Sequence, residues 1–233
     1  MAMELAGLYL FSYLLGTVPT AYLVGKLAAG VDLRAYGSGN VGAANLFYHL
    51  GKRWAIPLGV FEVLVKGACP VWIGQFALGL DRSPVLLVIA PLLAVAGHNW
   101  SPFLKFRGGR GIAVASGSLL ALSPPLLAVF VAVALAGWAV TKSSGVWVLI
   151  SLALLPLWTL MLPPKVALFA DPLVLSWYCI GLLGLVILKR LLSNWTPLQE
   201  GLPRKKVLFN RLFRDRDVDD NAAWVRRAPE GSE

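Results

Sequence analysis

The stretch "IAVASGSLLALSPPLLAVFVAVALAGWAV", residues 112–140, carries no charged side chain over its whole length. An α-helix rises about 1.5 Å per residue, so roughly 20 residues cross about 30 Å of hydrocarbon. This run is too long for one straight crossing. Pro124 and Pro125 divide it, because proline removes a helix donor and clashes with the preceding turn. The stretch therefore predicts two membrane helices joined at the prolines.

The composition of the whole chain agrees with a bilayer environment. The 233 residues are 58% hydrophobic and only 14% charged. In typical soluble globular domains, about a quarter of the residues are charged. Cys69 and Cys179 both fall inside apolar runs, which is typical of small buried hydrophobic residues rather than disulfide partners or metal ligands.

Hydrophobic runs predict an all-α polytopic membrane protein with about seven transmembrane or partly spanning helices. Their approximate bounds are 5–29, 53–79, 84–98, 110–122, 125–141, 145–162 and 172–192. The first run is too long for a signal-peptide core and lacks a basic stretch before it, so we expect it to be retained. No internal repeat is visible, which weighs against a transporter built from inverted halves.

A polar stretch separates the third and fourth segments, each of which is too short to cross alone. It reads "GHNWSPFLKFRGGRG", residues 97–111. We expect it to begin below the membrane surface. Irregular backbone at such depth persists only where protein or a wet cavity satisfies its polar groups. This loop should therefore line a cavity.

The basic residues predict the orientation in the membrane. The chain has 21 Lys and Arg against 12 Asp and Glu, a net charge of +9. An odd number of crossings puts the termini on opposite sides. With the N-terminus outside, the outer loops keep only Arg82 and Lys165, and Lys66 lies in a span. By the positive-inside rule we predict a multi-pass membrane protein with its N-terminus outside and its C-terminus in the cytoplasm.

The composition changes at Trp195. We expect residues 1–194 to form a membrane-embedded domain and residues 195–233 a basic cytoplasmic tail. Within the tail, "RKKVLFNRLFR", residues 204–214, mixes apolar and basic side chains. It fits either a helix in the headgroup layer or a disordered charged tail. Residues 215–233 are expected to be disordered.

The stretch "YGSGNVGAANLFYHLG", residues 36–51, is rich in glycine and asparagine. It contains the pattern G-x-G-x-x-G, but a dinucleotide site needs a preceding strand in a βαβ unit, and here a membrane helix precedes. A flexible linker is a second reading. We favour an anion cradle, in which bare amides converge on phosphate oxygens. Its donors would be the amides of Gly37, Gly39 and Gly42 with the side chains of Ser38, Asn40 and Asn45.

The second loop offers similar groups with charge. Gly108, Gly109 and Gly111 surround Arg110 just before a helix. Helix N-termini favour anions, and the guanidinium fork matches phosphate oxygens. Lys105 and Arg107 are either further anion ligands or anchors of the cytoplasmic face.

Three further polar residues lie in or beside the spans. Glu62 and Lys66 are four apart, so they share a helix face. They form either a structural ion pair or a site where Lys66 points at an anion. His98 and Asn99 open the second loop, and His98 is expected to make hydrogen bonds, since no cluster of metal-ligand residues accompanies it. We expect no metal and no cofactor.

The two loops in this order resemble the bacterial acyl-phosphate:glycerol-3-phosphate acyltransferases, the PlsY family. The resemblance is carried by "GSGNVGAANLFYHLG", "FEVLVKGACPV" and "GHNWSPFLKFRGGRGIAVASG", and it covers about residues 8–120. It implies seven membrane helices in the bacterial plasma (inner) membrane and an active site on the cytoplasmic side. It also implies transfer of a fatty acyl group from acyl phosphate to the first hydroxyl of glycerol 3-phosphate, with release of phosphate. The expected partners are these two substrates and membrane lipids, without nucleic acid.

Matching positions in the family motifs give the expected site. The catalytic residues would be Ser38, Asn45 and Arg110. The substrate-binding residues would be Gly37, Gly39, Asn40, Gly42, Lys66, His98, Asn99, Lys105, Gly108, Gly109 and Gly111. Since no Ser-His-Asp order or carboxylate pair stands out, we expect a substrate phosphate to act as the general base.

The chain departs from the family pattern at three positions. Tyr48 stands where the family has an Arg, and Gly184 and Ile187 stand where its last motif has His and Asn, while Arg190 and Leu191 remain. These departures motivate a second hypothesis, a catalytically impaired relative that binds a phosphorylated lipid or metabolite. A transporter or channel is a third hypothesis.

Overall fold

The computed structural model describes residues 1–161, 171–193 and 201–227, and within these the regular secondary structure is helical, without strands. Six segments are long and apolar enough to cross a membrane, which confirms the all-α polytopic class. They are Ala2–Ala29, Lys52–Ala77, Pro84–Leu104, Pro124–Thr141, Ser144–Met161 and Pro172–Leu192. A seventh apolar helix, Ile112–Leu122, is shorter.

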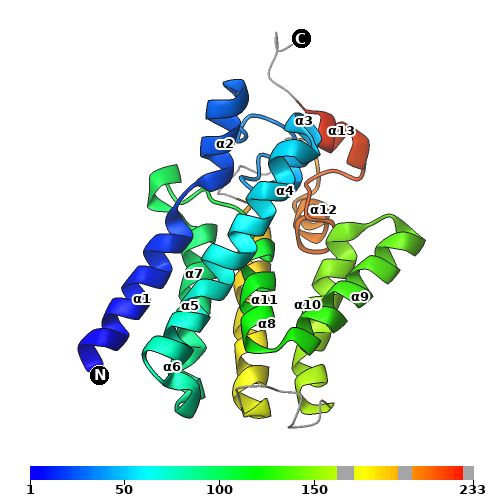
Figure 1. Ribbon diagram of the computed structural model, residues 1–233. Helices are drawn as coiled ribbons and strands as arrows, with labels where there is room; N and C mark the ends of the chain where they lie inside the picture. Colours follow the sequence, from blue (N-terminus) through cyan, green and yellow to red (C-terminus); the bar gives the residue numbers. More distant parts are fainter. Residues whose placement is uncertain (162–170, 194–200, 228–233) are drawn as a thin grey trace.

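The elements of the membrane bundle follow one another in an up-and-down order (Figure 1). In chain order they are α1 (Ala2–Thr17), α2 (Thr20–Ala29), α3 (Ala43–Leu50), α4 (Lys52–Phe61), η1 (Glu62–Ala68), α5 (Cys69–Trp72), η2 (Ile73–Ala77), η3 (Leu80–Arg82), α6 (Pro84–Leu87), α7 (Ile89–Asn99), η4 (Pro102–Leu104), α8 (Ile112–Leu122), α9 (Pro124–Thr141), α10 (Ser144–Met161) and α11 (Pro172–Leu192). The segments η1 and η2 are π-helical and continue α4 and α5 within one span. The N-terminus lies at the end of the bundle opposite α2 and α3 (Figure 1).

The first predicted helix is broken in two, between α1 and α2. Val18 leaves the helical conformation, with φ −56° and ψ 118°, immediately before Pro19. The residue before a proline is sterically pushed out of the α region, and proline itself donates no hydrogen bond. The Val18 carbonyl then accepts from the Thr20 amide at 2.9 Å and can accept a second hydrogen bond from another part of the chain.

The third predicted segment is longer than expected. Helices α6 and α7 run from Pro84 to Asn99, and η4 extends the segment to Leu104. The prediction that it is too short to cross is wrong, because the polar residues His98 and Asn99 remain helical. The fourth segment, α8, is short, as predicted.

Small residues let the central helices approach closely. A Cβ on Gly16 would overlap the backbone of Ala94, so α1 and α7 touch main chain to main chain. Gly67 and Gly117 do the same for η1 and α8. Membrane helices gain little from hydrophobicity in lipid, so close packing at small residues holds them together. This packing fixes Glu62 and Lys66 on η1 beside the second loop.

The tail after Gly201 is folded onto the bundle. Helix α12 (Arg204–Phe209) and the π-helical η6 (Asn210–Arg214) bury Val207 and Asn210, and η6 packs against α10 and α11. Helix α13 (Asn221–Arg226) lies at the same end of the bundle as α3 (Figure 1). The amide of Gly37 donates to the Arg227 carbonyl at 2.6 Å.

The expected disorder of the tail is therefore not found within residues 215–227. The sequence lacked the hydrophobicity of a core here, but buried ion pairs and main-chain contacts supply the order instead. Residues 195–200 and 228–233 lie outside the described part. Whether the helix over residues 204–214 rests in the headgroup layer stays a prediction.

Candidate active site

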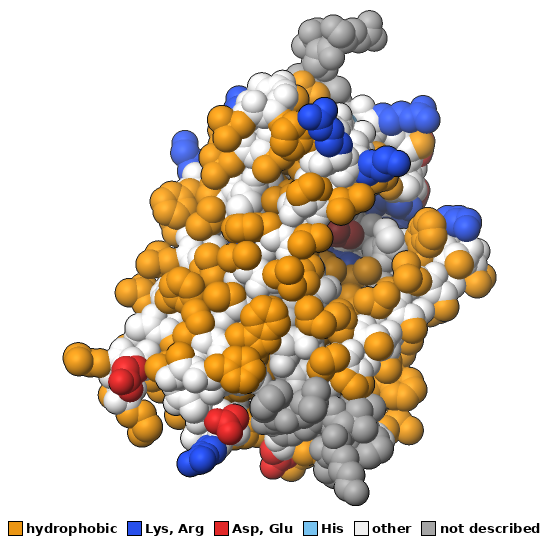
Figure 2. Space-filling view, viewed as in Figure 1, with side chains coloured by type: hydrophobic (Ala, Val, Ile, Leu, Met, Phe, Trp, Pro, Cys, Tyr) orange, Lys and Arg blue, Asp and Glu red, His pale blue; other side chains and the backbone are white. Residues whose placement is uncertain are grey.

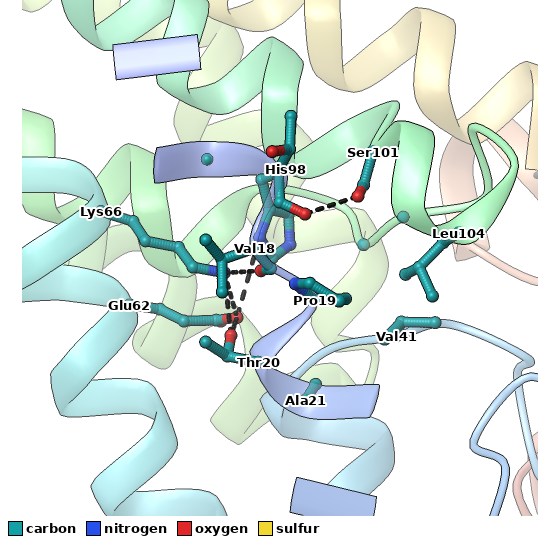
Figure 3. A pocket seen from close by; sticks show the side chains of 14 residues that line it. Val18, Pro19, Thr20, Ala21, Val41, Glu62, Lys66, His98, Ser101 and Leu104 are labelled. Atoms are coloured by element: carbon teal, nitrogen blue, oxygen red, sulfur yellow. Dashed lines mark hydrogen bonds and ion pairs between the residues drawn. The ribbon is translucent and has the colours of Figure 1, made fainter. Parts of the chain in front are cut away.

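A buried polar network holds the break between α1 and α2. The Lys66 ammonium donates to the Val18 carbonyl at 2.7 Å and to Thr20 Oγ1 at 2.8 Å. Thr20 Oγ1 in turn donates to Glu62 Oε1 at 3.0 Å, and Lys66 Nζ lies 3.6 Å from the same carboxylate oxygen. Both charged side chains are only 1% exposed. Figure 3 shows these groups pointing toward one another from α2 and η1, with His98 beside them.

The cavity at this network is nearly full. Its volume is about 10 Å³, which is roughly the room for one water. Lys66 already has two neutral acceptors and a carboxylate. The structure thus favours the structural reading of the Glu62–Lys66 pair, and a substrate anion has no space beside Lys66. His98 Nδ1 lies 3.7 Å from Glu62 Oε1 at the edge of this network.

The glycines of the second loop serve packing inside the chain. The Gly108 amide donates to the Asn99 carbonyl at 3.2 Å, and the Gly109 amide donates to the His98 carbonyl at 3.1 Å. A Cβ on Gly108 would overlap the His98 backbone, and one on Gly109 would overlap the His98 ring. The expectation that these two amides face an anion is therefore wrong. Glycine is needed here because the loop lies directly on the end of α7.

The main-chain and side-chain amides of the first loop also donate to carbonyls of the chain itself. Asn45 is 4% exposed, and its Nδ2 donates to the carbonyls of Leu33 and Tyr36 at 3.1 and 3.0 Å. The Gly39 amide donates to Tyr36, and Gly37 donates to the tail as described above. Both glycines have positive φ, at 67° and 51°, where a side chain is strained. Asn45 therefore shapes the loop, and its geometry gives no support to a catalytic role.

A much larger cavity, of about 480 Å³, opens where the two loops meet. The first turns of three helices line it, from α3, α8 and α10. The contributing residues are Gly42, Ala43, Ala44, Gly111, Ile112, Ala113, Ser144 and Gly145. First-turn amides have no partner within their own helix, and helix N-termini carry partial positive charge. The arrangement favours an anion inside this cavity.

Two arginines add full positive charge to the large cavity. Arg110 is 7% exposed, and its Nε donates to Asp215 Oδ1 at 2.6 Å. Its Nη1 is buried and has no hydrogen-bond partner among the described residues. Arg190 of α11 is 2% exposed, and its Nη1 donates to the carbonyls of Gly145 and Leu212, both at 2.9 Å. Arg110 thus retains donor capacity that the described protein does not use.

Other polar groups and an apolar wall complete the large cavity. Asn40, Glu62 and His98 line it, and Asn40 Oδ1 is buried without a partner in the described segments. Val63 and Val148 form part of its apolar wall. Figure 2 shows this face of the molecule hollowed below a group of Lys and Arg side chains. The cavity therefore matches a molecule with an anionic head and an apolar portion.

A smaller cavity of about 190 Å³ lies on the other side of the first loop. Its lining residues are Arg34, Ser38, Gly39, Arg107, Ser193, Trp224 and Arg227. Ser38 Oγ accepts from the Asn40 amide at 3.2 Å, so its hydroxyl proton is free to be donated. Hydrogen bonds from Arg34 lower the pKa of Asp32, which keeps that neighbouring carboxylate ionised. With three guanidinium groups, this cavity also favours an anion.

Several expected residues lie elsewhere. Lys105 is exposed with φ 53° and lines none of these three cavities. Asn99 is fully buried, and its carbonyl accepts from Gly108 and Lys189. Tyr48 is 61% exposed and borders a separate cavity under α13. Gly184 is exposed on the face of α11 away from Arg190, so a catalytic side chain at that position would point out of the site.

Sequence reasoning missed three contributors to these cavities. The N-terminus of α10 and the tail residues Asp215 and Arg227 carry no motif, and only the fold brings them to the loops. Arg190 did have a signal, since it remains from the family's last motif. Within residues 1–161, 171–193 and 201–227, no group of three or more His, Cys, Asp or Glu could hold a metal ion.

Comparison with known proteins gives a consistent result. Residues 6–201 match the family model described as glycerol-3-phosphate acyltransferase. Glycerol-3-phosphate acyltransferase 5 of Dehalococcoides mccartyi is 32% identical over 92% of this chain and 90% of its own length. Glycerol-3-phosphate acyltransferase of Clostridioides difficile is 38% identical over 67% of this chain and 78% of its own length.

Two solved structures have the same fold. The crystal structure of PlsY, an integral membrane glycerol 3-phosphate acyltransferase, in its glycerol 3-phosphate form has a TM-score of 0.70 and 28% identity, covering 80% of this chain and 88% of that one. The lysophosphatidic acid form has a TM-score of 0.71 and 26% identity, covering 95% and 98%.

Proposed function

The chain belongs to the glycerol-3-phosphate acyltransferase family, and we propose that it transfers a fatty acyl group from acyl phosphate to glycerol 3-phosphate in phospholipid biosynthesis. The products are lysophosphatidate and phosphate. One observation carries the choice of site. The 480 Å³ cavity combines three helix N-termini, two buried arginines and an apolar wall. Acyl phosphate has the matching chemistry, an anionic head on a fatty chain.

In this proposal, acyl phosphate binds in the large cavity. Its phosphate lies toward Arg110 and the first-turn amides of α3 and α8, and its acyl chain follows the wall formed by Val63 and Val148. Preorganised donors near the acyl carbon stabilise the negative charge that develops on its oxygen during attack. Phosphate is a good leaving group, so positioning and charge stabilisation supply much of the acceleration.

Glycerol 3-phosphate binds in the smaller basic cavity. That cavity lies across the first loop from the large one. Ser38 and Gly39 face the small cavity, whereas Asn40 and Gly42 face the large one. The substrates are thus held on two sides of one short segment. The glycerol hydroxyl attacks the acyl carbon, the bond from that carbon to phosphate breaks, and a substrate phosphate accepts the hydroxyl proton.

We also propose that this end of the bundle faces the cytoplasm of a bacterial cell, with the N-terminus outside. Figure 2 shows Lys and Arg side chains gathered at the end that holds the loops and α13. At the other end, Arg82 on η3 is the one basic residue within the described part of the chain. Such a distribution follows the positive-inside rule.

The test uses purified protein in lipid nanodiscs with acyl phosphate and glycerol 3-phosphate, following lysophosphatidate. We expect product that requires both substrates, and we expect acyl coenzyme A not to replace acyl phosphate. Product formed only from acyl coenzyme A contradicts the donor assignment. Binding of both substrates without product supports the catalytically impaired relative, for which Tyr48 outside the three cavities is the favouring observation.

A further inference from the structure

A carboxylate of the tail lies on the arginine assigned above to the substrate phosphate. Asp215 follows η6 directly and lines the large cavity. Its Oδ1 accepts from Arg110 Nε at 2.6 Å. Arg110 is 7% exposed in this pair, whereas Asp215 is 28% exposed, so the pair lies at the mouth of the cavity with its acidic member toward solvent.

The tail is anchored so that Asp215 reaches this position. Arg190 donates to the Leu212 carbonyl, and Arg211 forms a buried pair with Asp217, with Nε to Oδ1 at 2.7 Å. The backbone of Arg214 packs on Gly145, where a Cβ would lie 2.7 Å from the Arg214 carbonyl oxygen. These contacts hold the residues before Asp215 against α10 and α11, and the Arg211–Asp217 pair ties the residues after it to η6.

Asp215 itself is held less firmly than its neighbours. Its φ of 56° lies in the left-handed region, which Asp and Asn tolerate better than most residues. Because 28% of its side chain reaches solvent, its carboxylate can leave Arg110 and be hydrated without unfolding the tail. The pair therefore has a fixed cation and a displaceable anion.

We infer that Asp215 is a tethered competitor of the acyl phosphate, which must displace the carboxylate from Arg110 in order to bind. This inference rests on the proposed function, since it concerns the same arginine. A carboxylate and a phosphate both accept charge-assisted hydrogen bonds from a guanidinium. A competitor on the same chain acts at a high effective concentration, so it weakens the apparent affinity for the free anion. Arg110 Nη1 is buried and has no hydrogen-bond partner among the described residues, so it can donate to the phosphate once the carboxylate has moved.

The alternative role for Asp215 is to orient Arg110 for the substrate. The two roles predict opposite changes when the charge is removed. Competition predicts that Asp215→Asn lowers KM for acyl phosphate, by roughly tenfold for loss of one charge-assisted hydrogen bond. Orientation predicts a higher KM or a lower kcat. Asn also tolerates the positive φ, so the backbone should be unchanged.

The experiment measures initial rates against acyl phosphate concentration for the full chain in nanodiscs. Asp215→Asn should lower KM for acyl phosphate about tenfold, leave KM for glycerol 3-phosphate within twofold, and leave kcat unchanged. Asp215→Glu keeps the carboxylate and should stay close to the wild type. Asp81→Asn removes the same charge from η3 at the other end of the bundle and should change neither constant. An unchanged or raised KM for acyl phosphate in Asp215→Asn overturns the inference.

A binding measurement separates this inference from the proposed function. A non-hydrolysable acyl phosphonate should bind Asp215→Asn about tenfold more tightly than wild type. If wild type makes product but Asp215→Asn binds the phosphonate no better, the inference fails and the function stands. If wild type makes no product but the affinity rises, the function fails and the competition stands.

Discussion

Lys66 and Arg110 are both cations buried in the same end of the bundle, but their surroundings differ. Lys66 has two neutral acceptors and Glu62 around it in a space of about 10 Å³. Arg110 has one carboxylate partner, and its Nη1 has none among the residues that the structure describes, beside a cavity of about 480 Å³. A buried charge that is fully paired stabilises a local structure, whereas one with spare donors beside open volume can receive a ligand. From this difference we propose that Lys66 serves the fold and that Arg110 binds the substrate.

The largest expected effect is on stability, at Lys66. Lys66→Met leaves Glu62 buried without its cation and removes one of the two donors to the Val18 carbonyl, the other being the Thr20 amide. Breaking a buried pair in this way costs about 3–5 kcal/mol. Thermal unfolding in detergent should show a clear loss of stability. The double variant Lys66→Met with Glu62→Met should recover a large part of it, because the uncompensated charge is gone. If Lys66→Met has normal stability but no longer binds substrate, our assignment of Lys66 to the fold is contradicted.

Arg110→Ala should show the opposite pattern. We expect kcat/KM to fall by about a hundredfold or more, as for loss of a charge-stabilising donor. The unfolding temperature should change little, since Asp215 is partly exposed and can be hydrated. Rates and unfolding curves measured on the same preparation test this pair of outcomes. Arg82→Ala, which removes a cation at the other end of the bundle, serves as the matched control.

The second loop provides the next prediction, at Gly109. An added Cβ would overlap the His98 ring and lie 2.7 Å from the Val41 carbonyl oxygen. Gly109→Ala should therefore destabilise the protein by about 1–3 kcal/mol, the usual cost of overpacking. Gly7→Ala in α1, where a Cβ meets nothing within 4 Å, should be close to neutral by thermal unfolding. Equal stability of the two variants contradicts the packing role of the loop glycines.

The smallest expected effect concerns two adjacent arginines of the tail. Arg227 lines the small basic cavity, whereas Arg226 lines a different cavity beside Tyr48. Arg227→Ala should raise KM for glycerol 3-phosphate by about three- to tenfold, in the range of one hydrogen bond to a charged group. Arg226→Ala makes the same change in charge and should leave that KM within twofold. Equal effects from both would indicate only a general electrostatic contribution.

Much of the fold could be predicted from the sequence. Hydrophobic runs and prolines located the helices, including the division at Pro124 and Pro125, because membrane length and proline geometry act locally. The break at Val18 has a signal in the sequence, since Val18 precedes Pro19, but the prediction of one helix over residues 5–29 did not use it. Arg110 stood out because three glycines surround it.

The use of each polar group could not be predicted. The amides of Gly108 and Gly109 looked available to a ligand, but their partners at the end of α7 lie about ten residues earlier in the chain, and only folding reveals the pairing. Asp215 reaches Arg110 across 105 positions of sequence. Composition alone suggested a disordered tail. It reports how much hydrophobic core a segment can form, whereas the order of this tail comes from ion pairs and main-chain contacts.

A structure of the protein with a bound acyl phosphonate tests the comparison most directly. We predict the phosphonate oxygens within hydrogen-bond distance of Arg110, in the cavity shared by the first turns of α3 and α8, with Asp215 turned away. Lys66 should keep its contacts with Val18 and Thr20. A phosphonate bound at Lys66, or an Arg110–Asp215 pair left intact beside a ligand held elsewhere, would contradict our account.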